Sequence, residues 1–278
     1  MQGFLRPSID LIVFTLTLSL TSCSLHKATA DRSCRDCLEL DHVFIFVSKD
    51  APERESLIRL GFRAPDRVAR HTGQGTASVG FAFENAYLEL LWVEDEKEFQ
   101  ATCSADGEEF CARAQWRETG ASPLGIGLRN RCGDSHPPRL KYREHRAEWM
   151  KPDSCIYIIE DAGIHEPEYF VVPPYMALPA WVENVDTTHP IGARRLSRAE
   201  ITVCSKGHGV SDFGIGSGFN FVSADSRKPL SRAARLVGRS TEVGLHHGQA
   251  PLLVLTLDDD RQGKSADLRP ELPLVIKY

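Results

Sequence analysis

The chain has 278 residues, of which 42% are hydrophobic and 26% are charged. This composition is typical of a globular protein and leaves room for one large domain or two small ones. The formal net charge of −5 argues against a protein that binds nucleic acid, because such proteins usually carry a basic patch.

The beginning of the chain predicts export. Residues 11–20 form an apolar run that follows the cationic residue Arg6, and the run is shorter than the roughly 20 apolar residues that a membrane-spanning helix needs. We therefore expect a signal peptide over residues 1–22.

A cysteine follows this segment directly. Leu20-Thr21-Ser22-Cys23 resembles a bacterial lipobox, which implies cleavage before Cys23 and lipidation of its side chain. Residues 23–38 are small and polar, as expected of a tether, and Ser24 favours the outer membrane over the inner one. The resemblance implies an exported lipoprotein that is anchored in a membrane. A plain signal peptide that is cut nearby is the alternative.

Eight cysteines fit an exported protein better than a cytosolic one. Cys34-Arg-Asp-Cys37 lacks the strand-then-helix context of a thioredoxin site, so we expect a structural disulfide within this pair or to another cysteine. Cys103 and Cys111 bracket a turn-like segment and are the first pair that we expect to be bridged. Cys155 and Cys204 lie in strand-like apolar runs, which predicts that both are buried and reduced.

The first folded segment predicts a strand, a helix and further strands. Residues 43–47 are apolar, aromatic and β-branched, which favours a buried strand. Asp50 then precedes Ala51-Pro52-Glu53, a pattern that predicts a helix with Asp50 as its N-cap, and Gly61 is expected to end this helix. Residues 81–83 and 87–93 predict strands on either side of a turn, and the expected order is β-α-β-β-β.

A second module of this kind is expected to begin at residues 124–128. Its remaining strands are predicted at residues 141–150, 155–159 and 169–172. The polar, proline-rich residues 130–139 stand where a helix would be, so this module is expected to be irregular. Proline residues 173, 174 and 179 indicate a linker.

The C-terminal segment predicts a degenerate third module. Residues 196–203 align with residues 40–47, and residues 252–257 resemble residues 87–92. Residues 207–218 contain five glycines whose spacing does not match GxGxxG, so we expect a flexible loop here rather than a dinucleotide site. The pair His246-His247 is expected to lie in a loop.

The chain resembles the glyoxalase-like branch of the vicinal oxygen chelate superfamily at residues 40–43, 71–77 and 85–93, and further at residues 120–126 and 267–275. The resemblance implies an α+β fold in which paired βαβββ modules form curved mixed sheets around a cleft. In enzymes of the superfamily, a divalent metal such as Fe, Mn, Ni or Zn lies in that cleft. The bleomycin-resistance proteins of the same superfamily bind small molecules without a metal.

The resemblance places candidate metal ligands on the first and last strands of the two modules. It implies His42 and Glu89 from the first module, with Glu89 also the candidate catalytic residue, and Glu168 from the second, where Glu166 is an equally close rival. The fourth ligand should lie on residues 124–128, which offer only Leu, Gly and Ile.

The C-terminal segment does not supply the missing ligand. Arg198 aligns with His42, and Val254 aligns with Glu89. The alternative to a metal site is that His42 and Glu89 are polar cleft residues, hydrogen-bonded to each other or to a bound molecule.

A second group of candidate residues lies in a glycine-rich turn. Gly73 and Gly75 permit a tight turn, and His71, Gln74 and Thr76 would then present donors and acceptors to a ligand at the rim of the cleft. A hairpin loop with an incidental histidine is the alternative. Three nearby aromatic residues are expected in the core or the cleft wall: Phe83, Tyr87 and Trp92.

These observations predict a signal peptide (1–22), a tether (23–38), a glyoxalase-like domain of two modules (39–177) and a degenerate C-terminal module (178–278). We expect a protein that binds a small oxygen-rich metabolite, with metal-dependent lyase, isomerase or dioxygenase activity as one outcome. A metal-free binding or sequestration protein is the other. The expected partners are a small-molecule ligand, a membrane reached through the lipid anchor and, as one possibility, a second copy of the chain in a homodimer. Nucleic acid is not expected.

Overall fold

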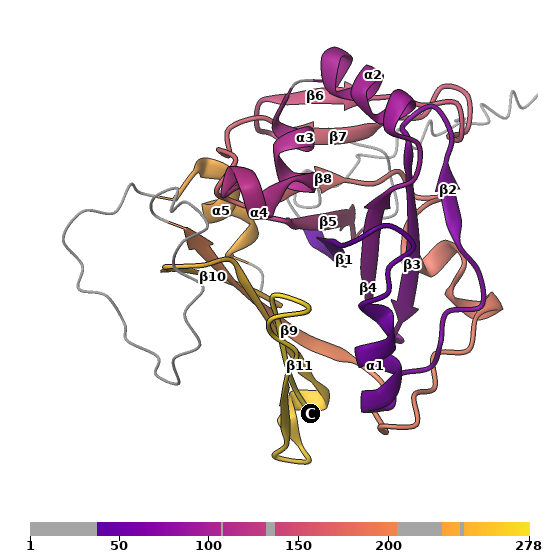
Figure 1. Ribbon diagram of the computed structural model, residues 1–278, viewed down its shortest axis with the longest axis vertical. Helices are drawn as coiled ribbons and strands as arrows, with labels where there is room; N and C mark the ends of the chain where they lie inside the picture. The colour runs from indigo at the N-terminus through magenta and orange to yellow at the C-terminus, as the bar shows by residue number, and fades with distance from the viewer. Residues whose placement is uncertain (1–37, 107, 132–136, 205–229, 240–241) are drawn as a thin grey trace, which may run out of the picture. The chain divides into compact units, whose positions relative to one another are not determined.

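Two mixed β-sheets organise the protein, and few helices accompany them (Figure 1). The computed structural model describes residues 38–131, 137–204, 230–239 and 242–278, apart from residue 107. The first sheet contains, in spatial order, β2 (Ala69–His71), β3 (Thr76–Ala82), β4 (Tyr87–Val93), β1 (Leu38–Phe46), β5 (Leu124–Asn130), β8 (Glu168–Val171), β7 (Ile156–Ile159) and β6 (Tyr142–His145). The second contains β10 (Val243–Gly248), β9 (Leu196–Cys204), β11 (Leu252–Leu257), β13 (Leu274–Lys277) and β12 (Ser265–Asp267).

The helices are short. They are α1 (Arg54–Leu60), α2 (Glu96–Asp106), α3 (Glu108–Ala114), α4 (Trp116–Thr119) and α5 (Arg232–Val237), with 3₁₀ turns η2 (Leu178–Ala180), η3 (Val182–Asn184) and η5 (Asp258–Asp260). The predicted α+β class is therefore confirmed. None of the described helices combines the length and the apolar character that a membrane span requires.

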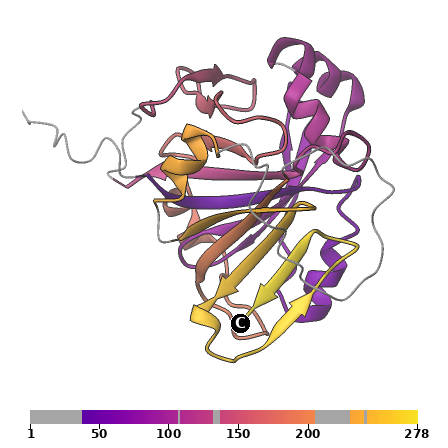
Figure 2. The same ribbon diagram turned by 90° about the vertical axis from the view of Figure 1, so that its left-hand side faces the viewer.

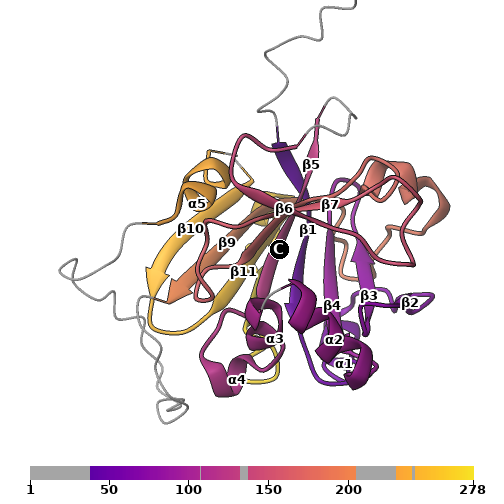
Figure 3. The same cartoon turned by 90° about the horizontal axis from the view of Figure 1, so that it is seen from above.

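The first sheet consists of two modules joined along their first strands. β1 pairs in parallel with β4 and antiparallel with β5, and β5 pairs in parallel with β8. Figure 3 shows β1, β4 and β3 side by side as viewed from above. The first module has the predicted β-α-β-β-β order, and the second has strands β5 to β8. The paired modules implied by the sequence are thus present.

The first helix begins later than predicted. Asp50 does not cap it: Asp50 and Ala51 have φ angles of 63° and 47°, and the amide of Ala51 donates to the carbonyl of Ser48 in a turn. Glu53 is the residue that precedes α1, and its carboxylate accepts hydrogen bonds from the amide and the hydroxyl of Ser48. Gly61 ends the helix in the left-handed conformation, as predicted.

Helices α2, α3 and α4 follow β4 and precede β5 in the sequence, so they connect the two modules. They were not predicted. Their apolar side chains, including Phe99, Phe110 and Trp116, pack with Phe46 of β1 in a second buried cluster. Their apolar positions do not follow one helical repeat, because three short segments turn relative to one another, so sequence periodicity gave no signal.

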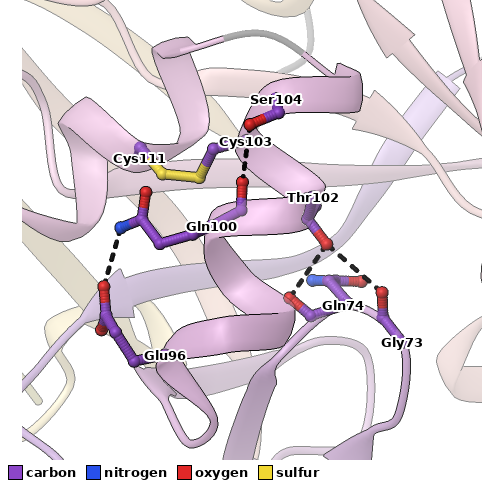
Figure 4. Close-up of a disulfide and its surroundings, with 8 residues drawn as sticks. All are labelled: Gly73, Gln74, Glu96, Gln100, Thr102, Cys103, Ser104 and Cys111. Atoms are coloured by element: carbon purple, nitrogen blue, oxygen red, sulfur yellow. Dashed lines mark hydrogen bonds between the residues drawn. A yellow bond between two sulfur atoms is a disulfide. The ribbon is translucent and has the colours of Figure 1, made fainter.

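A disulfide joins α2 to α3. Cys103 and Cys111 are bonded, with their Cα atoms 5.8 Å apart, and this confirms the predicted pairing. Figure 4 shows that Thr102, next to Cys103, directs its hydroxyl at the glycine-rich turn, where it donates to the carbonyls of Gly73 and Gln74 at 3.3 Å each. Two further cysteines, Cys155 and Cys204, are buried and free, also as predicted.

The second sheet repeats the pairing pattern at the centre of the first. β9 pairs in parallel with β10 and antiparallel with β11, and β11 pairs in parallel with β13. Figure 2 shows its orange and yellow strands lying side by side. In this pairing, β10 occupies the place that β4 has beside β1, and β11 occupies the place of β5.

This topology corrects two expectations from the sequence. Val254 does not stand in the place of Glu89, because β11 runs antiparallel to β9, whereas β4 runs parallel to β1. In the first sheet, Glu89 of β4 pairs with Phe44 of β1, and Phe44 aligns with Glu200 of β9. The residue of β10 that pairs with Glu200 is Gly244, so Gly244 takes the place of Glu89. His246 and His247 lie in strand β10 rather than in a loop.

Several expected features lie outside the described residues. They are the signal peptide at residues 1–22, the lipidation site Cys23, the tether through residue 37 with its CxxC pair, and the glycine-rich segment 207–218.

Close packing on β5 gives a first prediction. Gly125 lies opposite Phe44, and a Cβ atom there would overlap the Phe44 ring, which is itself packed against Phe46 and Phe170. We expect Gly125→Ala to lower the free energy of unfolding by roughly 1–3 kcal/mol in urea denaturation. Gly163→Ala is the control, since a Cβ at Gly163 meets no atom within 4 Å. Equal stability of the two variants would contradict this packing.

The disulfide gives a second prediction. Replacing both Cys103 and Cys111 with serine should lower the free energy of unfolding by roughly 2–3 kcal/mol, because a short loop is no longer closed in the unfolded chain. Urea denaturation measures the effect, and Ser104→Ala on the exposed side of α2 is the matched control. A double variant as stable as the wild type would show that the bond adds nothing to the fold.

Candidate functional site

A cavity of about 640 Å³ opens within the first sheet. Its walls come from both modules and from the connection between the two sheets, which contributes Trp181 and His189. Five of the residues predicted from the sequence line this one cavity: His42, His71, Gln74, Glu89 and Glu168. The fold therefore gathers side chains that are up to 126 positions apart in the chain.

His42 and Glu89 form the polar centre of the cavity, with Asp41 behind them. His42 Nδ1 lies 2.8 Å from Asp41 Oδ1, and His42 Nε2 lies 3.6 Å from Glu89 Oε2. Asp41 is fully buried, and its other carboxylate oxygen accepts from Arg129 at 3.2 Å and from the amide of Leu178 at 2.8 Å. Because an ionised carboxylate only accepts, Nδ1 of His42 carries the hydrogen and Nε2 is left facing Glu89.

Aromatic packing fixes the ring of His42. The ring stacks on Tyr87 at 4.3 Å, and its edge meets Phe170 at 5.2 Å. Across the sheet lies Gly127, where any Cβ would overlap the imidazole. Burial, with smaller contributions from the charges of Glu89 and Asp41, raises the pKa of Tyr87 well above 10, so the phenol keeps its proton.

Glu168 enters the cavity from β8, beside two arginines. Its carboxylate is 4.0 Å from the guanidinium of Arg143, and burial raises the pKa of Glu168, opposed by the charges of Arg113 and Arg143. The rival Glu166 does not line the cavity. It accepts hydrogen bonds from the amide and the hydroxyl of Ser231, which caps α5.

The glycine-rich turn forms a second polar group at the cavity wall. His71 Nδ1 lies 2.9 Å from Thr76 Oγ1, and the side-chain amide of Gln74 donates to the same oxygen at 3.1 Å. The other end of that amide, Gln74 Oε1, is 3.1 Å from His145 Nε2. Thr76 is buried and does not itself line the cavity, so it positions its neighbours. His145 was not predicted as a site residue, because it lies in the short strand β6 without a motif around it.

Among the expected aromatic residues, Tyr87 lines the cavity, whereas Phe83 and Trp92 are buried in the main core. Two aromatic residues of the cavity wall, Trp149 and Trp181, were not singled out. Both lie in segments without regular apolar periodicity.

A metal ion in this cavity would need several of these side chains as ligands. A separation of 3.6 Å between His42 Nε2 and Glu89 Oε2 suits two ligands of one ion. However, the described residues contain no group of three or more His, Cys, Asp or Glu side chains that could hold a metal. Gly127 stands where β5 would supply a ligand, and the carboxylate of Glu168 lies 4.0 Å from the guanidinium of Arg143. These residues, as arranged, do not fit a metal centre with three protein ligands.

Comparison with known proteins finds a similarity to a family over part of the chain. Residues 40–149, less than half of the sequence, match a family model described as a glyoxalase-like domain. This supports the resemblance inferred from the sequence for that part of the chain. No curated protein matches the sequence.

Solved structures give weaker likenesses. A hypothetical protein from Staphylococcus aureus shares 11% identity with a TM-score of 0.43, over 86% of this chain and 98% of that one. A mutant of 4-hydroxymandelate synthase from Streptomyces coelicolor shares 14% identity with a TM-score of 0.34, over 60% of this chain and 48% of that one. At TM-scores below 0.5, neither likeness bears on the function of this protein.

Proposed function

We propose that this protein, whose residues 40–149 match a glyoxalase-like domain, binds a small oxygen-rich molecule in the cavity of its first sheet. In this proposal a hydroxyl of the ligand lies between His42 and Glu89. The observation that carries the proposal is the orientation of His42, which Asp41 fixes with Nε2 towards Glu89.

The hydrogen-bonding capacity of this pair supports a ligand hydroxyl. The carboxylate of Glu89 is an acceptor, and it faces Nε2 of His42 across 3.6 Å, a separation longer than a hydrogen bond. The side chains of His42 and Glu89 are 5% and 14% exposed, and a largely buried acceptor is stabilised by a hydrogen-bond donor. A hydroxyl on the ligand supplies a donor to one of them, and aromatic side chains such as Tyr87 and Trp181 provide apolar contacts for the rest of the molecule.

A metal-dependent lyase, isomerase or dioxygenase is the competing function. The hydrogen bond from His42 to Asp41 favours it, since metal-binding histidines commonly donate their other ring nitrogen to a carboxylate. Fe, Mn, Ni or Zn would then be held by His42, Glu89 and Glu168. The arrangement of Glu168 and Gly127 described above favours the metal-free alternative.

Export remains part of the proposal. The pattern of residues 1–24 supports a signal peptide and a lipid anchor on Cys23, and the Cys103–Cys111 disulfide fits an oxidising compartment.

Two small aromatic probes test the binding proposal. Phenol can donate a hydrogen bond to Glu89 or His42, whereas anisole has a similar shape and cannot. We expect the full chain to bind phenol more tightly, by saturation-transfer NMR, and Glu89→Gln to weaken phenol roughly tenfold while leaving anisole unchanged. Glu55→Gln on the exposed part of α1 is the control. Equal binding of phenol and anisole by the wild type would rule out the proposed hydroxyl contact.

Metal analysis tests the competing function. After incubation with Fe, Mn, Ni or Zn and desalting, the full chain should retain far less than one metal ion per chain, because the described residues do not form a cage of three ligands. EDTA should leave the preference for phenol over anisole unchanged. One equivalent of metal, lost in a His42→Ala, Glu89→Ala double variant, would instead establish the metal-dependent alternative.

A further inference from the structure

The direction of the hydrogen bonds around Thr76 determines which ring nitrogen of His71 carries a hydrogen. The side-chain amide of Gln74 donates a hydrogen bond to Thr76 Oγ1, and Thr76 is only 2% exposed. The hydroxyl of Thr76 also needs an acceptor, and its described contacts offer one, Nδ1 of His71 at 2.9 Å. His71 therefore accepts at Nδ1, and in its neutral form the hydrogen lies on Nε2.

Other contacts support this form of His71. Burial lowers the pKa of His71, and the nearby His145 and His42 lower it further, against the opposing effect of Glu89. The ring is thus neutral at neutral pH, with one N–H left for the cavity that it lines. Nε2 of His71 has no hydrogen-bond partner among the described residues.

A second N–H group lies beside His71. The indole of Trp149 packs against the His71 ring with centroids 4.8 Å apart, and both residues line the cavity. Trp149 Nε1 is buried and has no hydrogen-bond partner among the described residues. A buried N–H without an acceptor is costly, so an oxygen atom next to these two rings would be stabilised.

We propose that His71 and Trp149 donate their N–H groups to a carbonyl oxygen of the ligand, so that the cavity selects neutral ketones, aldehydes or amides over carboxylates. This inference rests on the proposed binding function and specifies the ligand class. Both donors are uncharged, and the carboxylate of Glu89 acts electrostatically on His71. An anionic group at this position would therefore meet repulsion from Glu89. Of the arginines that line the cavity, Arg63 is paired with Asp186, Arg143 is paired with Glu168, and Arg67 is exposed. Thr76 and Gln74 are positioning residues, since they orient His71.

Three probes of similar size distinguish this contact from general binding. Acetophenone carries a neutral carbonyl, ethylbenzene has none, and benzoate carries a charge. For the full chain we expect acetophenone to bind roughly three- to tenfold more tightly than ethylbenzene in saturation-transfer NMR, with benzoate weaker than acetophenone.

Variants assign the preference to residues. His71→Phe and Trp149→Phe keep an aromatic ring and should reduce the acetophenone preference, with ethylbenzene binding unchanged. Thr76→Val should reduce it as well, because Nδ1 of His71 loses the hydroxyl that fixes its tautomer, and Thr76→Ser should restore it. Rescue by serine would not be expected if Thr76 only filled space.

The outcomes separate the two proposals. A wild type that binds acetophenone and ethylbenzene equally, or benzoate as tightly as acetophenone, overturns the carbonyl assignment, as does a preference that the three variants leave unchanged. In each case a preference for phenol over anisole would still support the contact at His42 and Glu89. If the wild type binds none of these aromatic probes, both proposals fail.

Discussion

The buried carboxylate of Asp41 holds the candidate site together. It accepts hydrogen bonds from His42 on its own strand, from Arg129 on β5 and from the amide of Leu178 in the connection between the sheets. A carboxylate without solvent needs several donors to stay ionised, and here the donors come from three separate segments. The same contacts that satisfy Asp41 therefore orient the imidazole and anchor the connection that completes the cavity wall.

Two glycines on β5 determine which side chains can line this part of the cavity. Gly125 and Gly127 lie opposite Phe44 and His42, and each leaves space that an aromatic ring fills. A ligand-bearing side chain at Gly127 would compete with the imidazole for the same volume. The His42 ring can occupy its position because Gly127 has no side chain. The same packing removes a possible metal ligand from β5, which favours binding through hydrogen bonds and aromatic contacts.

The second sheet has the same central strand pairing as the first, but its polar side chains are more exposed to solvent. Its pairing pattern repeats that of β4, β1, β5 and β8, but the polar side chains on one face of it are half exposed. Glu200 lies 3.3 Å from Arg198 and 3.4 Å from His246, beside Gly244. Ion pairs of this kind are screened by water and contribute little, so strand pairing alone does not create a binding site.

The sequence by itself determined strands β1 and β4, the end of α1 at Gly61, the Cys103–Cys111 pair and five polar residues that line the cavity. These depend on local patterns: apolar runs, a glycine after a helix, or two cysteines around a turn. It did not determine the start of α1, helices α2 to α4 or the direction of β11, because these depend on contacts with distant segments. Asp41, His145 and Trp149 gained their roles in the same way. Only the tertiary structure brought Leu178 to Asp41 and His145 to Gln74, and the state of a buried polar group is set by the partners that folding brings to it.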